Sequence, residues 1–224
     1  MLEQVQQDDV LRRTIGSVVA LLLLAGCIPK SQPRAPVRSP APPVESPFAL
    51  RQCFADLAAI GAKFQPLPDR LFPNGCSATN AVKLIAIGIP VTNLGAIRCG
   101  TALPLTQWVV QAVQSAAHDR LSGYVVKIES LGSFACRPIN NVAGNALSEH
   151  GRANAVDIAA FDLADGRRIT VRDGWNGADA DARAFLRQVH AAACRRFNIV
   201  LGPDANAYHR DHFHFDMGNG RACR

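Results

Sequence analysis

The chain has 224 residues, of which 48% are hydrophobic, and a formal net charge of +6 at pH 7. This length suits one domain with flanking segments, and the apolar content is sufficient for a core. Only 6% of the residues are aromatic, and no basic stripe is interleaved with them, so we expect no nucleic-acid binding.

Residues 1–26 have the pattern of a secretory signal. Arg12 and Arg13 precede an apolar run that is shorter than the roughly 20 residues of a membrane span, which argues against a plain transmembrane anchor. The run ends in Leu24-Ala25-Gly26-Cys27, which resembles the bacterial lipobox. The resemblance implies that Cys27 is lipidated and begins the mature chain.

Residues 27–47 are predicted to form an extended tether, because seven prolines fall within residues 28–47. The tether would hold residues 48–224 as a domain at a membrane surface. Ile28 follows the lipid cysteine in place of the aspartate of inner-membrane retention, which slightly favours the outer membrane.

Six cysteines remain when Cys27 is set aside, and an even number in an exported domain predicts disulfides. We expect them to pair in chain order as Cys53–Cys76, Cys99–Cys136 and Cys194–Cys223. The sequence has no C-x-x-C pair, which argues against a cysteine zinc site.

Apolar spacing predicts helices over residues 48–61, 105–121 and 178–197. The predicted strands cover residues 82–87, 124–128, 132–137, 154–161, 168–171, 198–201 and 212–217, with a hairpin turn at Asp165-Gly166. This order indicates an α+β fold, in which two long helices pack on a small, mainly antiparallel sheet. His118 and His190 lie on those helices and are expected to be a surface and a structural histidine.

Three of the six histidines lie close together in Tyr208-His209-Arg210-Asp211-His212-Phe213-His214-Phe215-Asp216, which we predict to be a strand. Alternate side chains of a strand face opposite sides. Phe213 and Phe215 should therefore face the core, and His212, His214 and Asp216 should face the other side.

A second polar segment runs from Ser148 to Asp157 and supplies His150 on a loop and Asp157 on a strand. If its strand neighbours the last one, His150, Asp157 and His214 converge as the three protein ligands of a catalytic zinc ion (Zn2+), with a position left for water. The remaining polar groups would support the ligands or act as the general base: His209, Asp211, His212 and Asp216. The alternative is that these histidines are hydrogen-bonded structural groups without a metal.

The pattern Ser148-x-His150-x-x-x-x-Ala155-x-Asp157 is similar to the S-x-H-x-x-G-x-A-x-D signature of the zinc D-alanyl-D-alanine carboxypeptidases and dipeptidases. Those enzymes belong with the lysostaphin-type and hedgehog-type zinc folds. Asp211-His212-Phe213-His214 resembles their second motif, in which a base precedes a ligand histidine. Residues 48–224 as a whole resemble the bacterial extensin-like C-terminal domain family, which is related to those peptidases.

The resemblance implies a role for each matching residue. His150, Asp157 and His214 would bind zinc, and Asp211 or His212 would be the base. Arg137 would polarise the scissile carbonyl or hold an oxyanion, and Ser148 would support the site or bind substrate. The chain departs from the signature at Ala153, where the family has glycine, and we expect this to affect specificity more than metal binding.

These observations predict an exported, lipid-anchored zinc peptidase that acts on peptidoglycan peptides. They do not distinguish an endopeptidase from an exopeptidase. The alternatives are a non-catalytic wall-binding domain that retains the fold, and a secreted binding module with buried histidines and no metal.

Overall fold

The computed structural model describes residues 45–224. The signal sequence, the lipobox with Cys27 and most of the tether at residues 27–47 lie outside the described residues. Within residues 45–224, none of the helices combines the length and apolar character needed to cross a bilayer.

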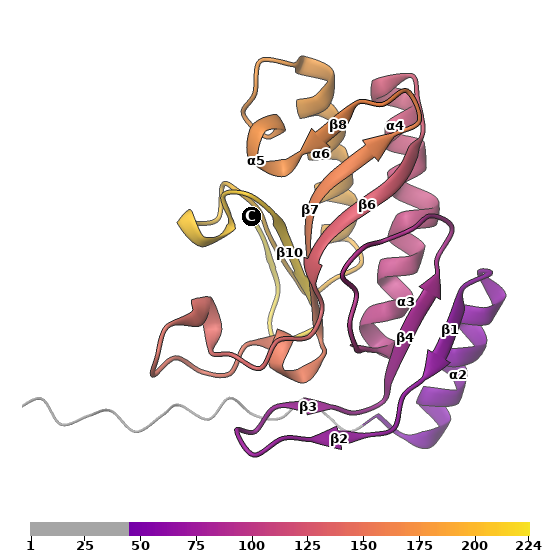
Figure 1. The fold of residues 1–224 in the computed structure, drawn as a ribbon, viewed down its shortest axis with the longest axis vertical. Coiled ribbons are helices and arrows are strands. Elements are labelled where there is room, and N and C mark those ends of the chain that lie inside the picture. Colours follow the sequence, from indigo (N-terminus) through magenta and orange to yellow (C-terminus); the bar gives the residue numbers. More distant parts are fainter. Residues whose placement is uncertain (1–44) are drawn as a thin grey trace, which may run out of the picture. The chain divides into compact units, whose positions relative to one another are not determined.

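The described chain has an α+β fold, as the sequence predicts (Figure 1). Its helices are α2 (Pro47–Ala59), α3 (Cys99–Gln107), α4 (Gln114–Leu121), α5 (Val171–Gly174) and α6 (Ala180–Cys194). A π-helical segment, η1 (Trp108–Val113), joins α3 to α4, and three short 3-10 helices are η2 (Ile139–Asn141), η3 (Glu149–Arg152) and η4 (Ala207–His209).

A six-stranded sheet forms the centre of the fold, with the order β11-β9-β10-β7-β6 and β8 paired to β7. Its strands are β6 (Val125–Gly132), β7 (Ala155–Leu163), β8 (Arg168–Thr170), β9 (Ile199–Leu201), β10 (Phe213–Asp216) and β11 (Ala222–Cys223). All these pairs are antiparallel except β11 with β9. Two small sheets contain β1 (Lys63–Pro66), β4 (Ala81–Ala86) and β5 (Ile97–Arg98) in one, and β2 (Arg70–Leu71) and β3 (Ser77–Ala78) in the other.

Segment η1 and helices α4 and α6 cover one face of the large sheet, and α4 and α6 lie behind it in the view of Figure 1. Trp108 is fully buried there, and its indole N–H donates a hydrogen bond of 2.8 Å to the carbonyl of Val189 on α6. Its ring contacts Phe215 of β10 edge-on, with the centroids 5.2 Å apart. This packing fixes which face of β10 is inward.

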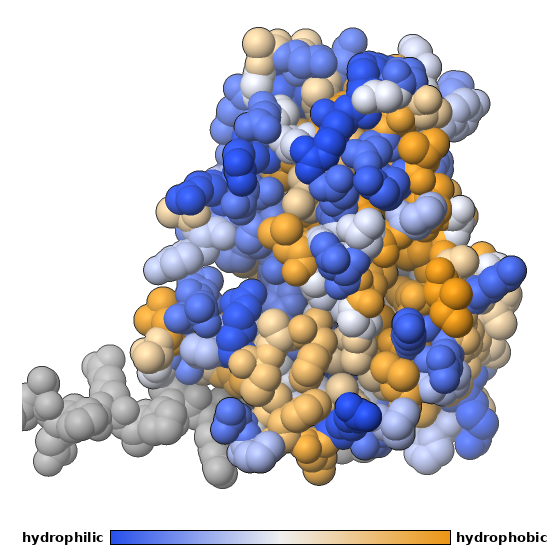
Figure 2. All heavy atoms as spheres, viewed as in Figure 1, coloured by the Kyte–Doolittle hydropathy of each residue, from blue (hydrophilic) through white to orange (hydrophobic). Residues whose placement is uncertain are grey.

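The other face of the sheet is polar. Figure 2 shows hydrophilic residues over the upper part of the view, where β6, β7 and β8 lie in Figure 1. Lys127 pairs with Asp162 at 2.5 Å, and Arg168 pairs with Glu129 at 2.5 Å. The exposed end of the sheet is thus covered by cross-strand ion pairs.

The predicted strand at residues 132–137 and the predicted helix at residues 105–121 both differ from the structure. The predicted strand at residues 132–137 is wrong, because Gly132 has a φ of 127° and ends β6, after which the chain leaves the sheet. The predicted helix at residues 105–121 begins earlier, at Cys99, because the fold accommodates Pro104 inside the helix although it has no N–H to donate.

The prediction that all six cysteines form disulfides is confirmed, but two of the three predicted pairings are wrong. The bonds are Cys53–Cys99, Cys76–Cys136 and Cys194–Cys223, of which only the last was predicted. Helix α2 packs on α3, which brings Cys53 to Cys99. Cys76 lies beside the loop that carries Cys136, so proximity in space, and not order along the chain, decides the pairs.

Phe215→Ala tests the packing beneath β10. The substitution removes a fully buried ring that contacts Trp108 and Phe197, and should lower the free energy of unfolding by about 3–5 kcal/mol. Leu131→Ala is the matched control, because this side chain is 58% exposed and should change stability by less than about 0.5 kcal/mol. Urea unfolding with the disulfides intact measures both, and equal effects would contradict the described core.

Candidate metal site

The register of β7 and β10 brings two predicted ligands face to face. Asp157 lies directly opposite His214 in the antiparallel pair, while Phe213 and Phe215 pair with Ile158 and Val156 on the core face. The prediction of an inward Phe213 and Phe215 is confirmed, since both are fully buried. His214 Nδ1 lies 2.9 Å from Asp157 Oδ1.

The third predicted ligand comes from η3, the short helix just before β7. The Ser148 hydroxyl caps this helix by accepting a hydrogen bond of 3.3 Å from the His150 backbone N–H. The helix ends at Ala153, whose φ of 53° is the left-handed conformation that glycine adopts most easily. Ala153 thus occupies a backbone conformation that would favour glycine, and the Ser148 hydroxyl has a structural role as the cap of this helix.

The three donor atoms form a nearly equilateral triangle. His150 Nε2 lies 3.1 Å from Asp157 Oδ1 and 3.2 Å from His214 Nδ1, and the third edge is the 2.9 Å contact between β7 and β10. In a tetrahedral zinc site with bonds of about 2.0–2.1 Å, ligand atoms are roughly 3.3 Å apart. All three side chains are buried. The donor types and their spacing fit zinc.

His214 is held by a second carboxylate. Its Nε2 lies 2.8 Å from Asp216 Oδ2, two residues along β10. With the Nε2–H donated to Asp216, Nδ1 is the atom that faces Asp157 and His150. A carboxylate behind a histidine is the usual way in which proteins fix the tautomer and orientation of a metal ligand.

The charges of the site favour a cation at its centre. Burial opposes the ionisation of Asp157, but hydrogen bonds from His150 and His214 outweigh it and hold the pKa of the carboxyl well below its usual range. Burial also opposes charge on His214, but Asp157 and Asp216 raise the pKa of its imidazole to about 9. The two carboxylates thus favour positive charge beside them, and a metal bound to His214 Nδ1 would have to replace a proton there.

His212 lies next to the triangle but precedes β10, so the predicted strand over Tyr208–Asp216 is shorter than expected and begins at Phe213. His212 Nε2 is 3.7 Å from Asp157 Oδ1, and His212 Nδ1 is 2.8 Å from Asp211 Oδ1. The hydrogen bond from His212 lowers the pKa of Asp211. Asp211 and His212 therefore form a pair in which His212 is nearer to the donor triangle.

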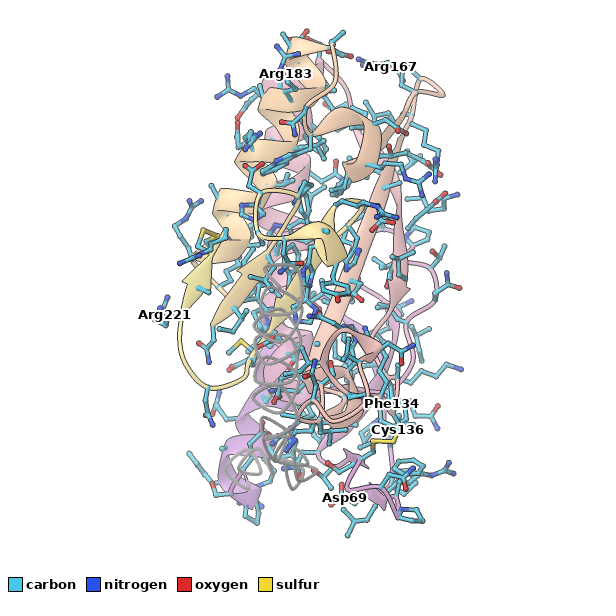
Figure 3. The ribbon with its side chains drawn as sticks, turned by 90° about the vertical axis from the view of Figure 1, so that its left-hand side faces the viewer. Asp69, Phe134, Cys136, Arg167, Arg183 and Arg221 are labelled. Carbon is cyan, nitrogen blue, oxygen red and sulfur yellow. A yellow bond between two sulfur atoms is a disulfide. The ribbon has the colours of Figure 1, made fainter. Side chains whose placement is uncertain are left out.

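Arg137 reaches the same site from a different loop. Its Nη2 lies 3.9 Å from Asp157 Oδ2, and the side chain is one-third exposed. The backbone carbonyl of Arg137 accepts a 3.1 Å hydrogen bond from the N–H of Ser148, which ties the arginine to the segment that carries His150. The disulfide Cys76–Cys136 anchors the adjacent residue (Figure 3).

One cleft of about 580 Å³ is lined by the donor triangle together with Arg137, Ser148, His212 and Asp216. Figure 1 shows the loop at residues 137–147 and the segment before β10 leaving the sheet on the same side, on the left of the view. The cleft wall also includes residues that the sequence did not single out: Ile139, Asn140, Asn141, Leu147, Asn206 and Tyr208. These residues lie in short or irregular segments whose sequences show no apolar periodicity. The one recognisable pattern among them is Asn206-x-x-His209, in which the asparagine caps the short helix η4.

One glycine is required by close approach. A Cβ on Gly151 would lie 2.7 Å from Leu147 Cδ1 and 3.1 Å from Cys76 Sγ, so this residue lets the 137–147 loop pack on the ligand helix η3. The sequence pattern leaves this position unassigned.

The two helix histidines lie away from the cleft, as predicted. His118 has a side chain that is 70% exposed. His190 is buried between Trp175 and Phe213, and its Nε2 lies 3.2 Å from the carbonyl of Arg224. His190 also lies near Cys194 and Cys223, but the disulfide between those two cysteines leaves no thiolate to bind a metal there.

Residues 51–224 match the family described as extensin-like protein C-terminus, which covers more than half of the chain. This chain belongs to that family. Comparisons with curated proteins and with solved structures found no match. The extensin-like domain thus contains every residue of the donor triangle, the Asp211–His212 pair and Arg137.

Metal analysis of purified protein tests the triangle. His214→Ala removes one of three ligands, so we expect its zinc content to fall to near zero, while wild type retains one equivalent. Asp216→Ala keeps the ligands but removes the group that orients His214, and should weaken zinc binding about 10- to 100-fold in a chelator competition. His118→Ala, at an exposed histidine, should bind zinc as wild type does. Full zinc retention in His214→Ala would contradict the assigned ligands.

Proposed function

We propose that this chain is a zinc-dependent peptidase of the bacterial cell envelope that hydrolyses amide bonds in peptidoglycan stem or cross-link peptides. The observation that carries the proposal is the donor triangle of His150, Asp157 and His214, with edges of 2.9–3.2 Å, at the base of an open cleft. Ligands of this kind with an open position are typical of catalytic and not structural zinc sites.

The metal, when bound, would supply an acidified water and polarise the substrate carbonyl. His212 would take a proton from that water through Nε2, since its Nδ1 is held by Asp211 at 2.8 Å. Asp211 would then act as the orienting group, and His212 is the one of the two candidates that we propose as the base. Asp211 is also paired with Arg172 at 3.9 Å, so it already has a cationic partner of its own.

Arg137 would stabilise negative charge on the carbonyl oxygen of the substrate. Its guanidinium borders the triangle at 3.9 Å from Asp157 Oδ2 while remaining partly open to the cleft. Ser148 would support the site through its cap on η3, because its hydroxyl already accepts the His150 N–H. These assignments follow the resemblance to zinc D-alanyl-D-alanine carboxypeptidases, whose fold type is part of the proposal.

The proposed location and substrate rest on the segments outside the domain. The signal at residues 1–26, the lipobox with Cys27 and the proline-rich tether would place the domain on the periplasmic face of a membrane, with the outer membrane slightly favoured. Three disulfides suit an oxidising compartment. Peptidoglycan peptides are the abundant amide substrate there, and they would be the partner of the cleft.

Digestion of muropeptides tests the enzyme against a non-catalytic wall-binding domain. His212→Ala should keep its zinc yet lower turnover by about 10²- to 10⁴-fold, because the base is lost while the ligands remain. His118→Ala is the control and should cut as wild type does. A zinc-loaded wild type that binds peptidoglycan and cuts no muropeptide would reject the peptidase and support the wall-binding alternative.

Cys27→Ser tests the membrane anchor. We expect the variant to leave the membrane fraction or to retain its signal sequence, since the lipid acceptor is lost. Membrane fractionation and intact mass measure this, with His118→Ala as a control at an exposed residue of the domain. Unchanged fractionation and mass in Cys27→Ser would contradict lipidation.

A further inference from the structure

The cleft residues outside the donor triangle indicate which kind of amide bond the site can accept. Asn140 and Asn141 line it from the 137–147 loop, and both adopt a φ of 57°. Asn206 and Asn219 line it from the segments that precede and follow β10. Neutral amides therefore line the same cleft as the donor triangle. The Oδ1 of Asn206 already accepts from the backbone N–H of Tyr208, which leaves its NH2 group as a donor. Amide groups both donate and accept hydrogen bonds and suit the N–H and C=O groups of a peptide backbone.

The loop that carries Asn140 and Asn141 is held in place by specific contacts. Pro138 and Leu147 form an antiparallel bridge across it, and the Asn145 amide donates to the carbonyl of Ile139 at 3.0 Å. The loop is anchored at its base by the Cys76–Cys136 disulfide and by a contact between the rings of Phe134 and Phe72, whose centroids are 5.4 Å apart. Figure 3 shows Phe134 and Cys136 together at this base.

Permanent positive charge is scarce along these walls. Among the described residues that line the cleft, Arg137 is the single lysine or arginine, and it lies beside Asp157 at the donor triangle. Glu149 and Asp216 add negative charge. The nearby Arg152 and Arg172 are paired with Glu149 and Asp211, each at 3.9 Å.

An enzyme that removes a C-terminal residue must hold a free carboxylate one residue beyond the scissile carbonyl. Taking that carboxylate out of water without a cationic partner is costly. If Arg137 is used at the scissile carbonyl, no other permanent cation among the described lining residues remains for this task. A chain that continues past the cut bond presents neutral amides instead, which the four asparagines match.

We propose that the cleft takes a peptide that continues on both sides of the cut amide, so that the domain is an endopeptidase that acts on internal or cross-link bonds. This inference rests on the proposed peptidase function and specifies which class of peptide bond the enzyme cuts. It assigns Asn140, Asn141, Asn206 and Asn219 to backbone recognition and leaves Arg137 to the reacting carbonyl.

The test uses two stem peptides of identical sequence, one ending in a free carboxylate one residue beyond the cut bond and the other in a carboxamide. Zinc-loaded wild type should cut both with kcat/KM values within about threefold. A carboxypeptidase would lose at least about tenfold on the amide, because a charge-assisted bond to the carboxylate is removed. A tenfold preference for the free acid would overturn the inference.

Arg137→Gln provides the second arm. If Arg137 acts at the scissile carbonyl, the variant should lose kcat by the same factor on both peptides. A loss confined to the free acid, seen mainly in KM, would show that Arg137 holds a terminal carboxylate and would overturn the inference.

Binding separates this inference from the proposed function. Calorimetry on zinc-loaded His212→Ala should give the acid and amide peptides Kd values within about threefold. If wild type cuts neither these peptides nor muropeptides, the peptidase proposal fails, and the binding ratio still decides the inference. Tenfold tighter binding of the free acid, or no binding of either peptide, would overturn it.

Discussion

The antiparallel register of β7 and β10 is the constraint on which the site depends. It places Asp157 opposite His214, and a slip of β10 by one residue would turn His214 into the core and away from Asp157. Phe213 and Phe215 prevent this slip, because they fill the interior beneath the same strand. The hydrophobic core thus sets the positions of two ligands, and the packing of the helices on the sheet becomes part of the site's chemistry.

The remaining donor depends on the connection into β7. Helix η3 holds His150, and its position is set by the Ser148 cap, by the left-handed Ala153 and by the close approach that Gly151 permits. Buried charge makes this arrangement demanding. The ionised Asp157 would be costly in the interior without cationic neighbours. The site therefore combines a rigid sheet with a locally capped turn, which suits a geometry that must hold three donors about 3 Å apart.

The sequence predicted the α+β class, the helices and most strands of the large sheet, because these elements have clear apolar periodicity. It also predicted all three residues of the triangle. His150 lies just before β7, Asp157 lies near the start of β7, and His214 lies within β10. The disulfide partners of Cys53 and Cys76 could not be predicted, because they depend on how α2 packs on α3 and on where the 137–147 loop lies. The cleft asparagines lie in loops, whose course depends on tertiary contacts.

A crystal structure with anomalous scattering at the zinc edge would test the central claim most directly. We predict a single peak bonded at about 2.0–2.1 Å to His150 Nε2, His214 Nδ1 and an oxygen of Asp157, with its remaining position open to the cleft. Absence of a peak there after zinc loading, or a peak held by other residues, would contradict the account.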